Sequence, residues 1–309
     1  MFTKSTLMIF KAIAPIHAGS GQDLGIVDMP IQREKHTGIP KIEGSGVKGV
    51  FREYFEEKSK LQEEIGEADV NVLFGPEGGK DYAAALGFSD ARLLFFPVRS
   101  LEGIFALVTC PYVLERLLED FKICQQKQEY IEKLKSIIEY GKKIHRGKCY
   151  LNDDKCLVFN DNVFLEEYMF DKEDDYEIKE KVNSILCDFT LNEEIKKRIV
   201  ILTDGDFIDF VTMHTEIITR NRIKRATGTT DDTALFTEEY LPAESILYTL
   251  ILASDRKITE DDKKYNAKEN LKIFIKNKPE LLQIGGNATI GKGIVKVFCA
   301  DSQEGDTIG

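Results

Sequence analysis

The chain has 309 residues, of which 42% are hydrophobic and 31% are charged, and its formal net charge is −11. No apolar run is long enough to span a bilayer, and no signal-like segment opens the chain, so we expect a cytoplasmic protein with no membrane partner. The six cysteines include no C-x-x-C pair, which argues against structural zinc and favours reduced thiols.

The first predicted elements are a strand and a long loop. Residues 4–14 are rich in apolar and β-favouring side chains and predict the strand. The loop runs from His17 through Asp28 to about Gly46. Loops longer than about 12–15 residues in a compact domain are usually functional or disordered. The composition of this one is too specific for a linker, which favours a functional loop.

A helix is predicted over residues 46–57, where four apolar residues share the buried stripe: Val47, Val50, Phe51 and Tyr54. Ser45 is a candidate N-cap for this helix. Lys48 and Arg52 lie one turn apart on another face. Free amide groups at a helix start beside a basic side chain are typical of a phosphate site, so we expect one here.

The middle of the chain predicts strands and then a helical segment. Strand-like stretches cover residues 91–96 and 104–109, and the pattern from 111 to about 200 is helical and charged. Further strands are predicted at 198–202, 207–213 and 246–252. The tail, residues 301–309, is polar and without an apolar pattern.

Residues 215–242 predict a β-hairpin with one cationic face. The cations of its first strand and turn are Arg220, Arg222, Lys224 and Arg225, and the first three alternate along the strand. On the return strand Phe236, Glu238 and Tyr240 share a face. The cationic face is either an RNA contact or an edge strand charged to discourage sheet pairing. The density of cations favours RNA.

A glycine-rich loop precedes the last strand. Its glycines are Gly285, Gly286, Gly291 and Gly293, and Lys292 adds a charge. The spacing does not match G-x-x-x-x-G-K-[ST], and no strand–loop–helix order surrounds it, which argues against a nucleotide-binding enzyme. A loop that contacts phosphates and an ordinary turn both remain open.

The basic residues are concentrated in three segments. Residues 31–52, 217–227 and 283–296 together carry a net +9, so the remainder carries −20. Because phosphate attraction is local, falling off within about 8–10 Å at physiological salt, an acidic protein with three such segments can bind RNA.

Two loop residues could carry chemistry. A lone Asp28 is either a turn former or a catalytic or metal-binding carboxylate. His17 is either a proton donor or acceptor or a loop hydrogen bonder. The residues alone leave both questions open.

Long, ordered stretches of the chain resemble a known family. They are HAGSGQDLGIVDMPIQREKHTGIPKIEGSGVKGVFRE (17–53), LFG (73–75), LGFSDARLLFFPVRS (86–100), LFTEEYLP (235–242) and GGNATIGKGIV (285–295). The chain is similar to the RAMP-superfamily subunit that forms the multi-copy backbone of type III-B CRISPR (Cmr) effector complexes. The resemblance implies an α+β fold: one domain over residues 1–300, with a ferredoxin-like (RRM-like) palm, a helical insertion at about 111–200 and a hairpin thumb at about 215–242.

The resemblance also implies a function. The partners would be guide (cr)RNA, complementary target RNA, other copies of the chain and other Cmr subunits. The chain would bind guide RNA and act as an endoribonuclease on the paired target, with a divalent metal, Mg²⁺ or Mn²⁺, as cofactor. Asp28 matches the family's cleavage residue and could bind that metal. His17, Glu238 and Tyr240 match its neighbours, while Ser45, Lys48 and the glycine loop with Lys292 match guide-binding positions.

Three rival functions remain to be tested. The first is a non-catalytic RNA-binding scaffold with the same fold and the same kind of complex. The second is a related monomeric enzyme that processes precursor guide RNA. The third is a metabolic nucleotide-binding enzyme that uses residues 285–293, against which the loop's surroundings argue.

Overall fold

The computed structural model describes residues 1–22, 25–61, 65–76, 82–173, 175–189, 193–221, 235–257 and 264–300. The helical segments are α1 Gly44–Lys60, α2 Glu67–Phe74, α3 Pro111–Ile123, α4 Gln128–Gly141, α5 Asp154–Leu157, α6 Tyr176–Ile185, the 3₁₀ turn η2 Leu186–Phe189, α7 Glu193–Lys196, α8 Asp204–Met213, α9 Ala267–Asn277 and the 3₁₀ turn η3 Ala288–Ile290. The strands are β1 Phe2–Ala12, β2 Lys41–Ile42, β3 Leu86–Phe88, β4 Ala91–Arg99, β5 Phe105–Thr109, β6 Lys148–Leu151, β7 Val158–Phe159, β8 Asn162–Leu165, β9 Tyr168–Glu173, β10 Ile199–Ile201, β11 Glu216–Arg220, β12 Phe236–Tyr240, β13 Ile246–Ser254, β14 Arg256–Lys257, β15 Lys264–Tyr265, β16 Leu281–Gln283 and β17 Ile294–Cys299.

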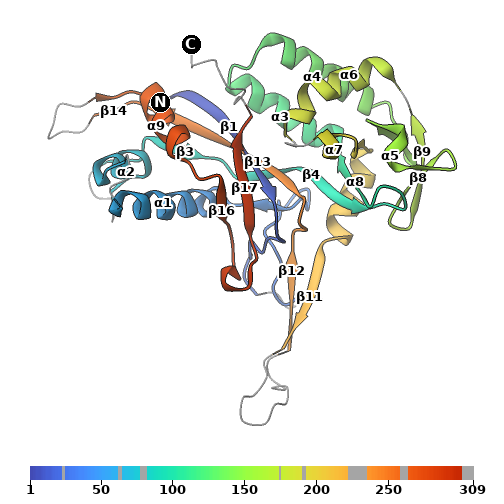
Figure 1. Ribbon diagram of the computed structural model, residues 1–309, viewed down its shortest axis with the longest axis horizontal. Helices are drawn as coiled ribbons and strands as arrows, with labels where there is room; N and C mark the ends of the chain where they lie inside the picture. The colour runs from blue at the N-terminus through green and yellow to red at the C-terminus, as the bar shows by residue number, and fades with distance from the viewer. Residues whose placement is uncertain are drawn as a thin grey trace, which may run out of the picture.

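The palm is a four-stranded antiparallel sheet in the order β17-β1-β13-β4 (Figure 1). Helix α1 lies between β1 and β4 in the chain, and α9 lies between β13 and β17. Two strand–helix–strand units interleaved in this order form the ferredoxin-like arrangement. The α+β, ferredoxin-like prediction is therefore confirmed.

Aromatic side chains form the core between the palm sheet and its helices. Phe51 of α1 lies 5.1 Å from Phe274 of α9 and 6.1 Å from Phe10 of β1, measured between ring centroids. Phe55 stacks on Phe274 at 5.6 Å. Burying each such ring stabilises the fold by about 1.5–3 kcal/mol. The central strand β1 is buried on both faces, which explains its continuous run of apolar residues.

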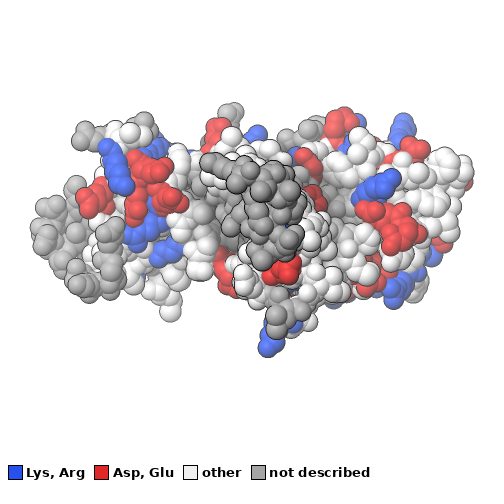
Figure 2. All heavy atoms as spheres, turned by 90° about the horizontal axis from the view of Figure 1, so that it is seen from below, with Lys and Arg blue, Asp and Glu red and all other residues white. Residues whose placement is uncertain are grey.

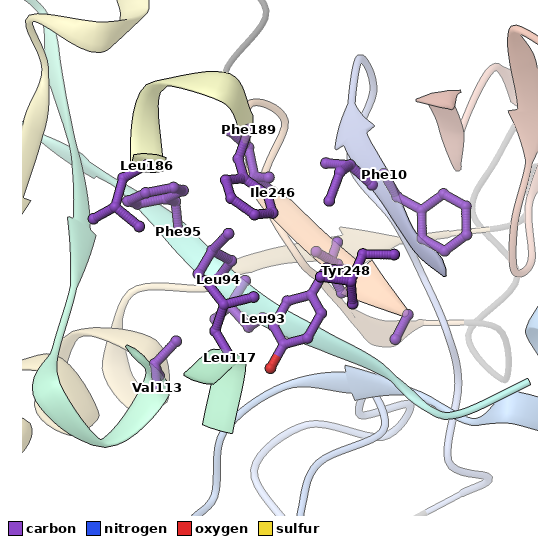
Figure 3. Close-up of a cluster of buried hydrophobic side chains, with 14 of the residues drawn as sticks. Phe10, Leu93, Leu94, Phe95, Val113, Leu117, Leu186, Phe189, Ile246 and Tyr248 are labelled. Carbon is purple, nitrogen blue, oxygen red and sulfur yellow. The ribbon is translucent and has the colours of Figure 1, made fainter. Parts of the chain in front are cut away.

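The sheet continues beyond the palm into the inserted segment, in the order β4-β5-β10-β6-β9-β8-β7. Leu93, Tyr248 and Phe10 of the palm belong to the same buried cluster as Val113 of α3 and Phe189 of η2 (Figure 3). Helices α3, α4 and α6 belong to the same inserted segment (Figure 1). The segment predicted to be helical therefore also contains the strands β6 to β9, and it packs directly on the palm.

The prediction of a strand at residues 207–213 is wrong, because these residues belong to helix α8. The hydroxyl of Thr203 caps the helix by accepting a hydrogen bond from the amide of Asp206 at 3.2 Å. Phe207, Phe210 and Val211 then fall at i, i+3 and i+4 and are buried. The β-favouring composition of the segment suggests a strand, although its apolar residues have helical spacing and Thr203 caps the helix.

The hairpin prediction at 215–242 is confirmed in its described part. Strands β11 and β12 pair antiparallel, with Glu216 opposite Tyr240 and Arg220 opposite Phe236. The hairpin projects from the palm as a thumb (Figure 1). Arg222, Lys224 and Arg225 lie outside the described residues.

Candidate functional site

The long loop after β1 lies along the thumb strand β12. The amide of Met29 donates to the carbonyl of Thr237 at 3.0 Å, and the amide of Glu239 donates to the carbonyl of Met29 at 3.0 Å. Ile16 and Leu241 exchange two further backbone hydrogen bonds. These bonds place Asp28 beside β12, so two segments more than 200 residues apart meet at the thumb base.

Asp28 is exposed, and Thr237 holds its carboxylate. Oδ2 of Asp28 accepts hydrogen bonds from the amide of Thr237 at 2.7 Å and from its hydroxyl at 2.8 Å. The same hydroxyl accepts from the amide of Asp28 at 3.0 Å. The Thr237 amide, followed by its hydroxyl, lowers the pKa of Asp28. The carboxylate is therefore ionised at neutral pH, and within the described part of the chain its Oδ1 makes no hydrogen bond.

His17 of the first loop is buried against β12 at Glu239, two residues beyond Thr237. Its Nδ1 lies 2.7 Å from the carbonyl oxygen of Glu239. Because a carbonyl only accepts, Nδ1 carries the hydrogen, which leaves Nε2 as the ring atom able to exchange a proton. A Cβ at position 19 would lie 2.9 Å from Nε2, so only a glycine there leaves room for the ring in this position.

The glycine-rich loop packs against His17. The amide of Gly286 donates to the carbonyl of His17 at 2.9 Å. Gly285 has φ +87°, and a Cβ there would lie 2.3 Å from the same carbonyl. Gly293 has φ +75°, and a Cβ there would lie 2.1 Å from the carbonyl oxygen of Ile284. The glycines therefore permit contact between loop and palm, while Gly291 faces open space.

Glu238 lies at the centre of a polar network on the opposite face of β12. Its Oε2 accepts hydrogen bonds from the hydroxyl of Tyr240 at 2.6 Å and from Nη1 of Arg220 at 2.7 Å. Asn287 donates to Tyr240 at 3.0 Å and accepts from Arg220 at 2.9 Å. The network joins both thumb strands to the glycine loop. The predicted pair Glu238 and Tyr240 is therefore brought together, and Arg220 is paired with it.

Burial and hydrogen bonding set the protonation of this pair. Burial opposes ionisation of Glu238, but the hydrogen bonds from Tyr240 and Arg220 outweigh it and lower the pKa of the carboxyl. Burial and the neighbouring carboxylate raise the pKa of Tyr240 to about 12. Nζ of Lys292 lies 4.8 Å from the centre of the Tyr240 ring, a cation–π distance. At neutral pH the network therefore contains an anionic Glu238 and a neutral Tyr240.

The start of α1, where a phosphate site is predicted, differs from the prediction in its N-cap residue. The helix begins at Gly44 with Glu43 as N-cap, so the prediction of Ser45 as N-cap is wrong. The amide of Gly44 donates to Asp90 at 2.9 Å, and a Cβ at position 44 would lie 2.6 Å from the carbonyl of Phe88. This close approach sets the helix start one residue before Ser45.

The first turn of α1 still presents free donors. Within the described residues the amides of Ser45 and Gly46 have no hydrogen-bond partner and Lys48 has no acidic one. Burial, followed by the charge of Arg52, lowers the pKa of Lys48. Arg52 itself pairs with Glu56 at 2.6 Å. Ser45 and Lys48 therefore remain available to an anion, while Arg52 is already engaged.

The described residues gather no metal ligands around Asp28. Their group of three donor side chains close enough to share an ion is Glu166, Glu167 and His214, which does not include it. Asp28 offers one exposed carboxylate with a free oxygen. Mg²⁺ usually keeps several waters and takes one or two carboxylates together with substrate phosphates, which a single carboxylate beside bound RNA can satisfy.

Two residues of the site escaped prediction from the sequence. Thr237 contacts Asp28, and Asn287 links Glu238, Tyr240 and Arg220. Thr237 stands in an ordinary strand pattern, so the sequence gives no sign of its partner. Asn287 does carry a signal, because Asn tolerates the left-handed backbone conformation and stands here beside glycines, and the structure gives it φ +65°.

The charge on the thumb side of the molecule is mixed. Seen from below, Lys and Arg lie among Asp and Glu over the described residues (Figure 2). Among the described residues of this face, any attraction for a polyanion therefore comes from single cations that lie close to it.

Comparison with known proteins assigns the chain to a family. Residues 9–296 match the RAMP superfamily. A Pyrococcus furiosus protein described as "CRISPR system Cmr endoribonuclease Cmr4" is 39% identical over 307 residues, 95% of each chain. The chain belongs to the Cmr4 family of the RAMP superfamily. The predicted resemblance is thus confirmed.

Solved structures of the Cmr4 family agree with this assignment. The structure described as oligomeric Cmr4 from Pyrococcus furiosus has 31% identity and a TM-score of 0.69, covering 96% of this chain and 98% of its own. A type III-B Cmr-beta structure bound to cognate target RNA has 21% identity and a TM-score of 0.77, covering 97% and 98%, and supports the fold alone. As for membranes, no helix in the described ranges combines the length and apolar character needed to span one.

Proposed function

We propose that this chain binds guide RNA as a backbone subunit of a type III-B CRISPR effector complex and cuts the paired target RNA at regular intervals. One observation carries the proposal. Asp28 and His17 from the first loop bond to Thr237 and Glu239 of the thumb strand β12, the strand that also carries Glu238 and Tyr240. They do so in a family whose Pyrococcus furiosus member is described as an endoribonuclease.

Two places on the palm suit the guide backbone. The free amides of Ser45 and Gly46 and the ammonium of Lys48 can bind one phosphate, with the helix dipole adding attraction. The glycine loop brings Lys292 to the ring of Tyr240, on the other side of the thumb base. Both features would contact the RNA backbone rather than the bases. We therefore expect base pairing between guide and target to supply specificity, as in other guided effectors.

The proposed partners are guide RNA, target RNA, further copies of this chain and other Cmr subunits. The solved Pyrococcus furiosus relative is described as oligomeric, which supports assembly of this chain with itself. A head-to-tail contact that does not close gives an open filament, in which each copy places one thumb along the guide. Regular thumbs predict regular cuts.

Cleavage is proposed to use the ribose 2′-hydroxyl beside the scissile phosphate. Its oxygen forms a bond to phosphorus while the bond to the 5′-oxygen breaks, leaving a cyclic phosphate and a 5′-hydroxyl. The proton lost by the 2′-oxygen is balanced by one gained at the 5′-oxygen. In-line geometry, which a regular duplex denies, can contribute several kcal/mol, and the thumb is placed to distort the strand.

The protonation of Asp28 and His17 suggests a different role in cleavage for each residue. The lowered pKa of Asp28 makes it a weak base, so we assign it to orienting the 2′-hydroxyl or holding a cation. His17, whose Nδ1 donates to the carbonyl of Glu239, would use Nε2 to move a proton. A Mg²⁺ or Mn²⁺ ion held by Asp28 would stabilise negative charge on the phosphate oxygens. Glu238 and Tyr240 fix the thumb base around them.

Substitution of Asp28 in the assembled complex tests the proposal. Asp28→Ala should abolish target cleavage at every site while guide and target binding stay within about two-fold of wild type. Glu102→Ala, which removes an exposed carboxylate at the β4–β5 turn, should cut normally. Full cleavage by the Asp28→Ala complex would favour the non-catalytic scaffold. Cleavage of precursor guide RNA by the isolated chain would favour the processing enzyme.

A further inference from the structure

We infer that Thr237 is a positioning residue for cleavage, whose hydroxyl aims the Asp28 carboxylate at the target strand. The inference rests on the proposed function of Asp28. It concerns a residue of the thumb that acts through Asp28 rather than on RNA. Both hydrogen bonds of the hydroxyl go to Asp28, one to its carboxylate at 2.8 Å and one from its amide at 3.0 Å.

Thr237 is the support of an otherwise exposed loop tip. Gly25 and Ile26 lead into Asp28, and the side chain of Ile26 is 98% exposed. No other hydrogen bond to the Asp28 side chain occurs in the described part of the chain. With Oδ2 fixed by the amide and hydroxyl of Thr237, the rotation of the carboxylate is restricted, and Oδ1 is left without a hydrogen bond among the described residues. A catalytic group must be held within about 0.5 Å of its productive position, which an unsupported loop does not achieve.

The hydroxyl is not needed to attach the loop to the thumb. Met29 already exchanges backbone hydrogen bonds with Thr237 and Glu239 at 3.0 Å. The amide of Ile31 donates to the carboxylate of Glu239 at 3.0 Å, and Arg33 pairs with the same carboxylate at 2.5 Å. What the hydroxyl adds is the direction of one side chain. Threonine suits this task because its branched Cβ fits a strand and restricts χ1.

The same contact couples Asp28 to the thumb. Thr237 is an integral part of β12 and pairs with Thr219 of β11. Any displacement of the hairpin by a bound strand therefore moves the atoms that hold the carboxylate. Asp28 is thereby fixed relative to the element that distorts the target, rather than relative to the palm alone.

Replacement by valine removes the hydroxyl and keeps the strand-forming shape. In the assembled complex, Thr237→Val should lower the single-turnover cleavage rate at saturating target about ten-fold, with half-saturation within about two-fold of wild type. Thr237→Ser, which restores the hydroxyl, should recover the rate to within about three-fold. Thr219→Val, the cross-strand counterpart, controls for a valine in the same hairpin and should keep the wild-type rate.

The outcomes separate this inference from the proposed function. If Asp28→Ala abolishes cleavage but Thr237→Val cuts as fast as Thr219→Val, the positioning role fails and the catalytic role of Asp28 stands. A Thr237→Ser complex as slow as Thr237→Val would also overturn it, because shape rather than the hydroxyl would then matter. If Asp28→Ala cuts normally, the proposed function itself is wrong.

Discussion

At the scale of single residues, the site is organised by the alternation of side chains along β12. Thr237 and Glu239 contact the first loop, while Glu238 and Tyr240 join Arg220 and Asn287 on the other face. A strand separates the two sets because successive side chains point in opposite directions. The geometry therefore gives one exposed carboxylate next to a rigid, charge-balanced network.

The ion pair between Glu34 of the first loop and Arg116 of α3 gives a pH-dependent prediction. Glu34 is buried, and burial opposes its ionisation, but hydrogen bonds from Arg116 and Thr37 lower the pKa of the carboxyl below 4.5. The unfolded chain therefore holds more protons on this group. Its contribution to the free energy of unfolding is fully present above pH 4.5 and is lost as the pH falls through the folded-state pKa.

Thermal unfolding of Glu34→Gln measures this contribution. The variant should be less stable than wild type at pH 7, by about 2 kcal/mol for a lost charged hydrogen-bond pair. The difference should shrink below pH 4. Glu53→Gln, an exposed carboxylate without a described partner, is the control and should follow wild type. A Glu34→Gln difference that is the same at pH 3.5 and pH 7 would contradict the assignment.

At the scale of elements, the glycine-rich loop shows why some glycines are required. Gly285 and Gly291 both have positive φ, but a Cβ at 285 would lie 2.3 Å from the carbonyl of His17, whereas at 291 nothing lies within 4 Å. The two positions therefore differ only in the room available. The loop is built around contact with His17 at one end and exposure at the other.

Alanine substitution separates these two effects. Gly291→Ala should cost about 1–2 kcal/mol of stability, the strain of a left-handed alanine. Gly285→Ala should cost more, and it should also weaken guide RNA binding because the loop can no longer close on His17. Denaturant unfolding and filter binding measure both. Equal losses at the two positions would show that the contact with His17 is unimportant.

Elements with strong local signals were predictable from the sequence, and others were not. The stripe of Val47 and Phe51 gave α1, and alternation gave the thumb strands. Residues 207–213 were misread because Phe207 and Val211 favour strands, while the helix depends on a cap at Thr203. The composition of the segment does not show that Thr203 caps a helix.

The site itself was predictable only in part. Asp28, His17, Glu238 and Tyr240 followed from the resemblance to a family, not from periodicity. Thr237 could not be found, because its partner lies more than 200 residues away in the chain and only the folded loop brings them together.

At the scale of the whole molecule, an acidic protein must bind a polyanion. The net charge is −11, and cations on the thumb side are interleaved with acids (Figure 2). Binding therefore depends on a few cations held close to the phosphates. We propose that Lys48 of α1 and Lys292 of the loop between β16 and β17 are two such cations.

The salt dependence of guide binding tests this arrangement. Lys292→Ala should weaken guide binding and reduce the slope of log affinity against log salt by about one. Lys135→Ala removes an exposed cation of α4 on the insertion and should leave the slope unchanged. An unchanged slope for Lys292→Ala would mean that this side chain does not contact a phosphate.

In the proposed mechanism, each copy of the chain uses its own Asp28 to cut the target strand that passes its own thumb. Complexes assembled from wild-type and Asp28→Ala chains at known ratios measure this directly. We expect every band of the regular cleavage ladder to persist, with a single-turnover intensity that falls in proportion to the wild-type fraction and reaches zero when all copies are mutant. A full ladder from the all-mutant complex would contradict it.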